Sequence, residues 1–589
     1  MENKLQAISQ KVKRVVLYYP MVLAMSLTMA FTIVLQIEHD EWQLNKQFLP
    51  MKIIITSGLG ISLLFAIKML SQRVGREFLW QLLGIVLLVG FYLILPERGA
   101  DFNEVYIFVL IPTFVLSHLL VACVAFLRKE PEIKFWQYNK NLFVNFFLTL
   151  VFTGVLTGGV MLAIVAVEEL FAFDFRETIY AQTYFILSIV GSTFIFLLFS
   201  ERGLDYLELD GNYPIVLKFF TQFILIPLLL IYVVILYLYA AKILFTWQLP
   251  QGWVSYLILA YSILGILALL LVHPLKDASA KSWVKIFSRI FYFTLLPLIV
   301  LLFTAIFTRV LEYGFTEARY FVLLLAVWLL CVVLYFIMIK NATIKFIPVS
   351  LFLLGMSALV LPYVNAFSVA KRSQKNALEN IFQTHALLQN GKIDFDKKVP
   401  GAVVSSISDK FEFLSERHEG EYLKQFLAVV YQKNFVDGQN FYIDGLFTNK
   451  TSDTKNRSEL RLTNSEKFNL IGDYQYAIQE DELLYGKVTF NNDEFSLKKV
   501  TYTEPVFELT LNASEKVDFM PLITQLFDRH RNRLGDVTTD TLFVESDIGA
   551  YHVKVIFGNM SRSGIRDEND YYFDNALFLI RKDGAPTKK

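Results

Sequence analysis

A single histidine lies near the middle of a long apolar stretch. His118 follows Pro112 and Ser117 within Val105–Leu127, a run long enough to cross a lipid bilayer. An ionisable side chain at that depth is costly, and it usually faces the interior of a helix bundle or a water-filled cavity. A proton relay or a ligand contact is one interpretation, and a neutral histidine hydrogen-bonded to a neighbouring helix is the other. Because the sequence shows no second histidine or carboxylate at the same depth, no metal site is predicted.

Three basic residues form a second candidate group. Lys218, His273 and Arg289 fall at ends of apolar stretches that are predicted to share the cytoplasmic side. If those ends meet, the side chains would form a pocket for a phosphate or an anionic lipid headgroup. Long basic side chains near the ends of membrane helices also reach the headgroups without any further role. Both interpretations stay open.

The turn Glu312–Tyr320, between two apolar stretches, is rich in polar residues. A plain turn needs only Gly314 and a helix N-cap, for which Thr316 is suited. The dipole of the next helix also favours a carboxylate in its first turn. The turn holds more polar residues than these roles require, and its candidate functional residues are Glu312, Tyr313, Glu317 and Arg319.

We predict that this polar turn contacts the soluble C-terminal domain or the helix by which the chain leaves the membrane, Ser368–Gln374. Both lie on the same predicted side of the membrane, and Arg372 is placed to pair with Glu312 or Glu317. Such an ion pair is weak in water and stronger when it is partly desolvated. Its role would be to fix the orientation of the C-terminal part on the helices.

An acidic cluster, Glu38-His39-Asp40-Glu41, lies in the first predicted outer loop. A metal or glycosyl-donor site is one interpretation, and an ordinary solvated acidic loop is the other. In the C-terminal part we find no G-x-S-x-G, no H-E-x-x-H, no phosphate loop and no paired Cys/His spacing. The sequence therefore names no catalytic residue and no cofactor.

The elements that must position these residues are apolar helices. Hydrophobic residues make up 55% of the chain, and the net charge of +1 gives no global field that would attract nucleic acid. A stretch of about 20 apolar residues spans a bilayer, where only a helix closes its own hydrogen bonds. The sequence predicts eleven spans: Val15–Ile37, Ile53–Leu70, Phe78–Leu95, Val105–Leu127, Leu142–Val167, Ile179–Phe199, Val216–Phe245, Trp253–Val272, Ile286–Leu311, Tyr320–Ile339 and Phe346–Asn365.

Two stretches rich in small residues lie within these spans. Gly58-Leu-Gly60 and Gly154-x-x-x-Gly158-Gly159 are both typical of helices that pack closely. Both are therefore interpreted as ordinary helix-packing surfaces.

The distribution of Lys and Arg predicts the orientation. Short loops rich in these residues stay in the cytoplasm, and here they alternate from the N-terminus onward with loops that hold few. The N-terminus is therefore predicted to be cytoplasmic. An odd number of spans then places the C-terminal part outside the cytoplasm.

The predicted domains are a transmembrane helical domain, 1–367, and a soluble α+β domain, 368–589. Helices are expected at Ser368–Leu388, Ala402–Leu414, Glu421–Tyr431 and Val517–Leu534. Short alternating runs punctuated by Asn and Asp-Gly turns predict strands between and after them, which favours α+β over a doubly wound sheet. The expected strands are Phe441–Ile443, Leu460–Leu462, Tyr474–Ile478, Lys487–Phe490, Phe495–Tyr502, Val506–Leu511, Thr541–Glu545, Tyr551–Phe557 and Ala576–Arg581.

Several local patterns resemble the bacterial membrane family catalogued as domain of unknown function 4153. This resemblance implies the architecture and a bacterial inner membrane, and it transfers no catalytic residue. The patterns are Tyr213-Pro214 with Lys218-Phe-Phe-Thr-Gln222-Phe-Ile-Leu-Ile-Pro227, Leu271-Val-His273-Pro274, the polar turn, Ala366-Phe367-Ser368-Val369-Ala-Lys-Arg372-Ser373-Gln374, and Ser405-Ser406-Ile407 leading to Leu414, Arg417-His418 and Tyr422-Leu423.

The leading functional hypothesis is a non-enzymatic inner-membrane protein in transport or envelope assembly, whose C-terminal domain gates or recruits. A membrane-embedded transferase acting on a lipid-linked substrate is the alternative suggested by Glu38–Glu41 and by Lys218, His273 and Arg289. An envelope sensor is the third. The expected partners are the lipid bilayer and an envelope protein or a lipid ligand, without nucleic acid.

Overall fold

The chain forms two compact units. The computed structural model describes residues 2–38, 48–126, 130–171, 173, 175–209, 214–246, 253–273, 282–433, 435, 443–447, 450–451, 459–464, 473–484, 486–490, 492–500, 505–529, 535–539, 542–566, 568–574 and 576–582. The first unit is Met1–Ile393 with Asp409–Phe441, and the second is Asp394–Ser408 with Tyr442–Lys589. The division predicted at residue 367 concerns contact with lipid and water, and it stays a prediction.

Helices build the first unit. Those of its apolar part are α1 (Glu2–Tyr18), α2 (Pro20–Glu38), α3 (Leu49–Val74), α4 (Glu77–Ile94), α5 (Val105–Cys123), α6 (Glu132–Phe171), α7 (Glu177–Ile186), the π-helix η3 (Leu187–Gly191), α8 (Ser192–Leu198), α9 (Leu204–Leu207), α10 (Ile215–Phe219), the π-helix η4 (Phe220–Leu225), α11 (Ile226–Thr246), α12 (Trp253–Val272), α13 (Ser282–Tyr313), α14 (Glu317–Met338) and α15 (Phe346–Val360). Helices α16 (Ala366–Thr384), α17 (Gly401–Ser415), α18 (Gly420–Lys424) and α19 (Val429–Gln432) follow, with the hairpin β1 (Leu388–Gln389) and β2 (Lys392–Ile393) after α16. Of α17, only the part from Asp409 onward belongs to the first unit.

Within the described residues, ten helical stretches are long and apolar enough to cross a membrane, so this is a multi-pass membrane protein. The sequence predicted eleven, and the difference is α15, whose 15 residues fall short of the roughly 20 that a bilayer requires. The first span is also shorter than predicted. It begins at Pro20, because a residue that precedes proline disfavours helical geometry and Tyr19 separates α1 from α2. The predicted orientation depends on whether the number of spans is odd, and it stays a prediction.

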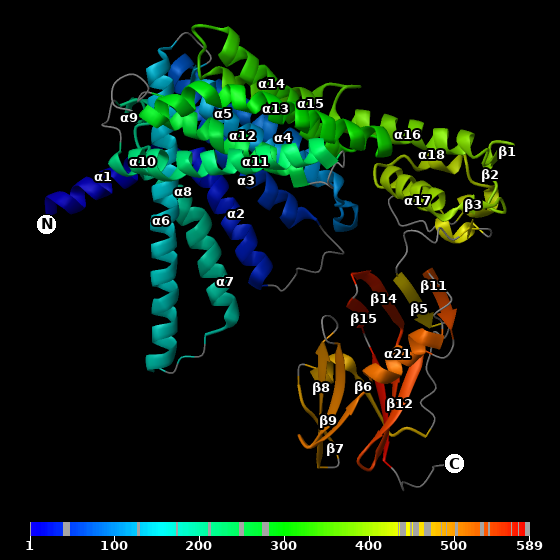
Figure 1. The fold of residues 1–589 in the computed structure, drawn as a ribbon. Coiled ribbons are helices and arrows are strands. Elements are labelled where there is room, and N and C mark those ends of the chain that lie inside the picture. The colour runs from blue at the N-terminus through cyan, green and yellow to red at the C-terminus, as the bar shows by residue number, and fades with distance from the viewer. Residues whose placement is uncertain are drawn as a thin grey trace. The chain divides into compact units, whose positions relative to one another are not determined.

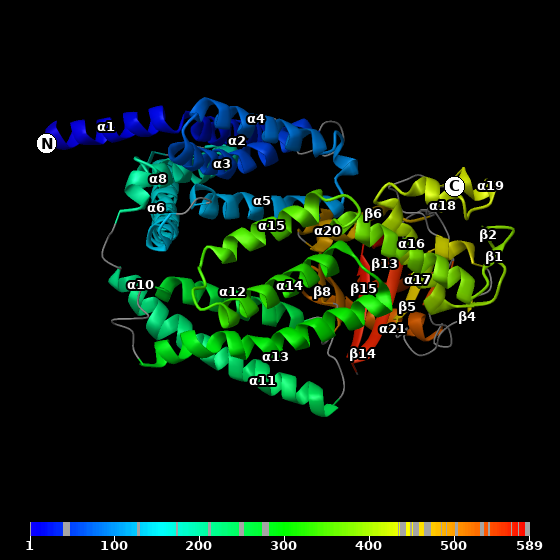
Figure 2. The ribbon, with the colours of Figure 1, turned by 90° about the horizontal axis from the view of Figure 1, so that it is seen from above.

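The apolar helices pack around two clusters of buried side chains. In Figures 1 and 2, α11 to α14 run side by side, and Phe291, Leu295 and Leu329 are among the side chains buried between them. The second cluster includes Tyr19 and Leu64 and joins α2, α3, α6 and α8. A Cβ at Gly60 would lie 2.8 Å from Met25 Cγ, so α3 approaches α2 closely there, as its glycines predicted.

The second unit is built on β-strands, which confirms the predicted α+β C-terminal domain. Two antiparallel sheets have the orders β10-β9-β8-β7 and β12-β13-β16-β6, and a third, β11-β5-β14-β15, includes the parallel pair β11 and β5. The helix α21 (Met520–Arg529) buries Ile523, Leu526 and Phe527 in the same core as Phe507 and Phe578.

The elements of this unit are β3 (Val399–Pro400), β4 (Lys450–Thr451), β5 (Glu459–Asn464), β6 (Tyr476–Gln479), α20 (Glu480–Leu484), β7 (Val488–Phe490), β8 (Asp493–Val500), β9 (Val506–Leu511), β10 (Glu515–Asp518), α21, β11 (Gly535–Thr539), β12 (Phe543–Ile548), β13 (Tyr551–Ile556), β14 (Asn559–Arg566), β15 (Glu568–Asp574) and β16 (Leu577–Lys582). The helix predicted at Val517–Leu534 is shorter than expected. Asp518 ends β10 and accepts a hydrogen bond from the Met520 N–H, so the helix starts only there. The end predicted at Leu534 and the strand residue Phe441 lie outside the described residues.

Candidate functional site

The polar turn between α13 and α14 docks on α16. The Phe315 N–H donates to Ser373 Oγ at 2.9 Å, and the Gln374 side-chain amide donates to the carbonyl oxygens of Tyr313 and Phe315 at 3.0 and 2.8 Å. Gly314 has φ +76°, and a Cβ there would lie 3.0 Å from Ser373 Oγ, so glycine suits both the backbone and the contact. The predicted contact between the turn and Ser368–Gln374 is confirmed.

The predicted role of Arg372 in this contact is wrong. Its guanidinium donates to the Tyr363 carbonyl oxygen at 2.9 Å instead of pairing with a glutamate of the turn. Consecutive residues of a helix point about 100° apart, so the face of α16 that presents Ser373 and Gln374 to the turn directs Arg372 elsewhere. Glu317 has a different partner.

Glu317 forms a two-pronged ion pair with Arg417. Arg417 Nε lies 2.8 Å from Glu317 Oε1 and Nη2 lies 2.9 Å from Oε2, with 1% of the glutamate side chain and 7% of the arginine side chain exposed. A planar guanidinium matches a carboxylate in this geometry, and burial strengthens the attraction. The arginine is held further by the Phe413 carbonyl oxygen at 2.9 Å and by the ring of Phe413. The pair joins the first turn of α14 to the end of α17.

The end of α17 explains why Arg417 is held so well. The Glu419 N–H donates to the Leu414 carbonyl and the His418 N–H donates to the Ser415 carbonyl. His418 has φ +57°, which completes a Schellman-type helix end with histidine at the position that glycine usually occupies. This rigid helix end fixes the backbone on which Arg417 stands.

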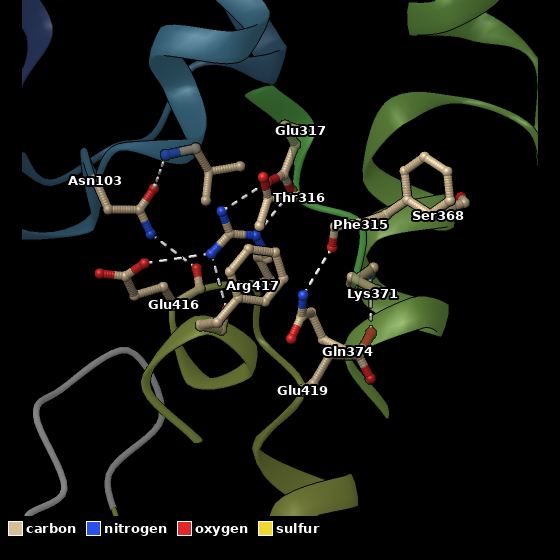
Figure 3. Close-up of polar contacts among 12 residues, drawn as sticks. Asn103, Phe315, Thr316, Glu317, Ser368, Lys371, Gln374, Glu416, Arg417 and Glu419 are labelled. Atoms are coloured by element: carbon tan, nitrogen blue, oxygen red, sulfur yellow. Dashed lines mark hydrogen bonds and ion pairs between the residues drawn. The ribbon is translucent and has the colours of Figure 1, made fainter. Parts of the chain in front are cut away.

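Three further contacts surround the Glu317–Arg417 pair (Figure 3). Asn103, just before α5, donates to the Glu416 carbonyl oxygen at 2.8 Å. On the side of α16, Glu419 pairs with Lys371 at 2.8 Å and with Lys375 at 2.6 Å. The residues that follow α17 therefore contact the start of α5, the polar turn and α16. We call the residues Asn103, Glu317, Gln374, Glu416, Arg417 and Glu419 the junction.

The other residues of the turn have structural partners or are exposed. Arg319 donates to the Gly314 carbonyl oxygen at 2.7 Å and lies over the ring of Tyr313. Thr316 caps α14 as predicted and accepts from the Arg319 N–H. Glu312 and Tyr313 are exposed at the end of α13. Any function of Glu312, Tyr313 and Arg319 beyond these contacts stays a prediction.

His118 lies beside a cavity of about 680 Å³ in the first unit. Its Nδ1 is 2.8 Å from the Phe114 carbonyl oxygen of its own helix, so a proton on Nδ1 would be satisfied there. Nε2 is then the nitrogen that can accept a hydrogen bond. The hydrogen bond runs within α5 rather than to a neighbouring helix, and a proton relay stays a prediction.

The basic group Lys218, His273 and Arg289 stays a prediction as a pocket. Lys218 is half-buried in α10, and His273 follows α12 with its Nε2 3.4 Å from a carboxylate oxygen of Glu132. The side chain of Arg289 lies outside the described residues.

Only part of the acidic loop is described. Glu38, at the end of α2, pairs with Arg176 at 2.9 Å and accepts from the Gln182 amide at 2.8 Å. His39, Asp40 and Glu41 lie outside the described residues. In the described part of the chain, no group of three or more His, Cys, Asp or Glu side chains is arranged to hold a metal ion.

Comparison with known families covers most of the first unit. The family described as domain of unknown function (DUF4153) matches residues 21–393. The chain belongs to this family. The match includes the apolar helices, the polar turn and α16, and it ends before Arg417.

A relative and a search of solved structures complete the comparison. An uncharacterized protein, PM1469, of Pasteurella multocida (strain Pm70) is 30% identical to this family member over 243 residues, or 41% of the chain. The match spans 40% of that relative's length. No solved structure matches. Neither description names an activity, so the family establishes the class of protein and not its chemistry.

Of the junction residues, Glu317 and the segment that contains Gln374 were predicted from the sequence, and Asn103, Glu416 and Glu419 were not. Arg417 entered only through the resembling pattern Arg417-His418. The one feature of the sequence that marks Arg417 is its position at the end of an amphipathic helix that follows the apolar part of the chain. Its partner, Glu317, lies 100 residues away, and no local pattern in the sequence links the two.

The stability of the junction should depend on pH, because the pKa values of two of its glutamates are shifted in opposite directions. Burial raises the pKa of the Glu419 carboxyl, but the hydrogen bonds and charges of Lys371 and Lys375 outweigh this and hold the pKa below its usual value. Burial likewise raises the pKa of Glu416, and there it prevails over the charge of Arg417.

We expect Glu419→Gln to reduce the loss of stability on acidification, measured as the thermal unfolding midpoint from neutral pH to below about 4, past the ordinary Glu pKa. With a depressed folded-state pKa, Glu419 stabilises above its unfolded-state pKa, and the contribution is lost as the pH falls through the folded-state value. Glu416→Gln is the control. Its raised pKa favours the fold at acid pH, so this variant should keep the acid loss or deepen it. Identical profiles for Glu419→Gln and the wild type would contradict the assignment.

Proposed function

We propose that this protein acts in transport or envelope assembly in the bacterial inner membrane, with a C-terminal domain that gates the membrane part or recruits a partner to it. In this proposal the N-terminus is cytoplasmic and α15 crosses the membrane as a short eleventh span, which places the C-terminal domain in the periplasm. The distribution of Lys and Arg among the short loops supports the orientation.

The observation that carries the proposal is the buried Glu317–Arg417 pair. An ion pair with 1% and 7% exposure is costly to assemble, and simple attachment of a helix would be achieved as well by apolar contacts. Two matched charges instead specify one register between α17 and the turn that joins α13 to α14. A displacement of α17 therefore either moves these two apolar helices or breaks the pair, which is the property that a coupling element requires.

The test is complementation in the source bacterium. A strain that lacks the protein should become sensitive to a bulky antibiotic that an intact envelope excludes, and the wild-type chain should restore resistance. Arg417→Ala, present in the membrane at the same level, should fail to restore it, because the coupling is broken while the spans remain.

Arg372→Ala is the matched control, since this exposed arginine of α16 makes one hydrogen bond to a backbone carbonyl. It should restore resistance fully. Full restoration by Arg417→Ala, or an unchanged envelope barrier in the strain that lacks the protein, would overturn the proposal.

A further inference from the structure

The cavity beside α6 has a row of three threonines along one wall. Thr149, Thr153 and Thr157 follow one another at intervals of four residues, so they lie on one face of the helix. All three are buried, with 6%, 9% and 8% exposed, and all three line the cavity. Their hydroxyl oxygens are shielded and have no hydrogen-bond partner within the described residues. We call these three residues the threonine row.

Several threonines elsewhere in the apolar helices are hydrogen-bonded, although Thr56 of α3 and Thr178 of α7 also have no partner within the described residues. Thr304 and Thr308 of α13 donate to the carbonyl oxygens four residues earlier, at 2.9 Å in both cases. This is the usual way for a hydroxyl to be satisfied inside a membrane helix. A buried hydroxyl without a partner is unfavourable in an apolar medium. Rotation of these side chains would turn their hydroxyls toward a partner that enters the cavity and would satisfy them.

Two glycines beside the threonine row leave space for that partner. A Cβ added at Gly154 or Gly158 would meet no atom within 4 Å, in contrast to the tight contact at Gly60. The small residues of α6 therefore border open space, and the interpretation of this stretch as a helix-packing surface is wrong for Gly154 and Gly158. Both glycines line the cavity.

The other walls indicate the chemistry of the partner. Apolar side chains such as Phe65 and Phe196 dominate the lining, and no Asp, Glu, Lys or Arg is part of it. Ser62 is already hydrogen-bonded to Ser117. His118 also lines the cavity, but a neutral imidazole supplies no counter-charge, so an ionic group inside would be costly in this membrane-spanning region. The partner combines an apolar chain with an uncharged oxygen group.

The position of the cavity indicates where the partner comes from. Phe146 and Leu150 line it and are 64% and 63% exposed on an apolar membrane helix, so the cavity borders a surface that faces lipid. Its volume is within the range of about 300–1,000 Å³ that is usual for small-molecule sites. A lipid can thus enter from the side without crossing water.

We propose that this cavity binds an uncharged glycerolipid, with its acyl chain along Phe65 and Phe196 and its ester or hydroxyl oxygens on the threonine row. A hydroxyl group both donates and accepts, so each threonine suits an ester carbonyl as well as a lipid hydroxyl. This site is independent of the function proposed for the junction.

The test is photolabelling of the full-length protein in lipid nanodiscs. The probes are a diacylglycerol with a photoreactive acyl chain, a phosphatidylglycerol with the same chain, and a hydrocarbon of equal length without oxygen. The diacylglycerol should label peptides of α6 and α3 around the cavity in preference to the other two probes. Excess unlabelled diacylglycerol should abolish this labelling.

Two variants separate the polar and the apolar part of the site. Replacing the threonine row by valine (Thr149→Val, Thr153→Val, Thr157→Val) keeps the shape and should lower the preference for diacylglycerol over the hydrocarbon by about tenfold or more (~1.4 kcal/mol). Gly158→Leu should fill the space and reduce labelling by both probes. The double variant Thr304→Val, Thr308→Val is the control. It should change neither the preference for diacylglycerol nor the labelling by the two probes.

Three results would overturn the proposal. Labelling by phosphatidylglycerol equal to that by diacylglycerol would contradict an uncharged ligand. An unchanged preference in the valine variant would show that the hydroxyls do not contact the lipid. Absence of competable labelling at α6 would mean that the cavity holds water alone. If Gly158→Leu fails to fold, the valine variant still decides between these outcomes.

Discussion

Arg417→Ala is expected to lower the free energy of unfolding of the helical unit by about 3–5 kcal/mol, because it leaves Glu317 as a buried charge without its partner. Few single substitutions cost as much. The free energy of unfolding of Arg417→Lys should lie between those of the wild type and Arg417→Ala. An ammonium group keeps the charge but cannot form the two-pronged contact. Chemical denaturation of the purified protein in detergent, followed by hydrogen exchange in α14 and α17, measures the loss.

Arg372→Ala is again the comparison. Its side chain is exposed and its hydrogen bond goes to one backbone carbonyl, so a change within about 0.5 kcal/mol is expected. Equal losses for the two alanine variants would mean that the Glu317–Arg417 pair contributes no more than a surface contact.

Glu480→Ala should have a similar effect on the C-terminal unit. Glu480 is 2% exposed at the start of α20, and its carboxylate accepts from Lys499 Nζ at 2.6 Å and from the Ala576 N–H at 2.9 Å. Removing it deprives a largely buried lysine of its counter-charge and a buried backbone N–H of its acceptor. We expect a loss of about 3–5 kcal/mol, measured by hydrogen exchange in β8 and β16 of the full-length protein.

Glu494→Ala is the matched control in the same unit. Glu494 pairs with Lys487 on the surface, where 38% and 64% of the two side chains are exposed. Exposed pairs of this kind contribute about 0–1 kcal/mol. If the amide hydrogens of β8 and β16 exchange as slowly in Glu480→Ala as in Glu494→Ala, the buried Glu480–Lys499 pair does not stabilise this unit.

Much of the fold followed from the sequence because its signals are local. A long apolar run must be helical in a bilayer, and this alone located most of the spans. The exceptions were also local: Pro20 interrupts the first run, and α15 is too short. The turn at Gly314 and the cap at Thr316 were predictable for the same reason, since each depends on neighbours within three residues.

The partners of the polar turn depended on tertiary structure. That the turn meets α16 followed from the shared predicted side and from an excess of polar residues. Which arginine would meet Glu317 did not follow, because the answer depends on the rotation of α16 and on the helix end at His418. The threonine row shows the same limit. Its spacing is visible in the sequence, but helix packing and a ligand cavity require the same small residues.

Glu317 and Arg417 together fasten the chain after α15 to the apolar helices. A double-mutant cycle with Glu317→Ala, Arg417→Ala and the double variant measures this coupling, with the free energy of opening of residues 409–424 followed by hydrogen exchange. We expect the double variant to lose less than the sum of the single variants, by about 0.5–3 kcal/mol, because removing both charges leaves neither one buried alone. Losses that add within about 0.3–0.5 kcal/mol would show that the two residues do not act as a pair.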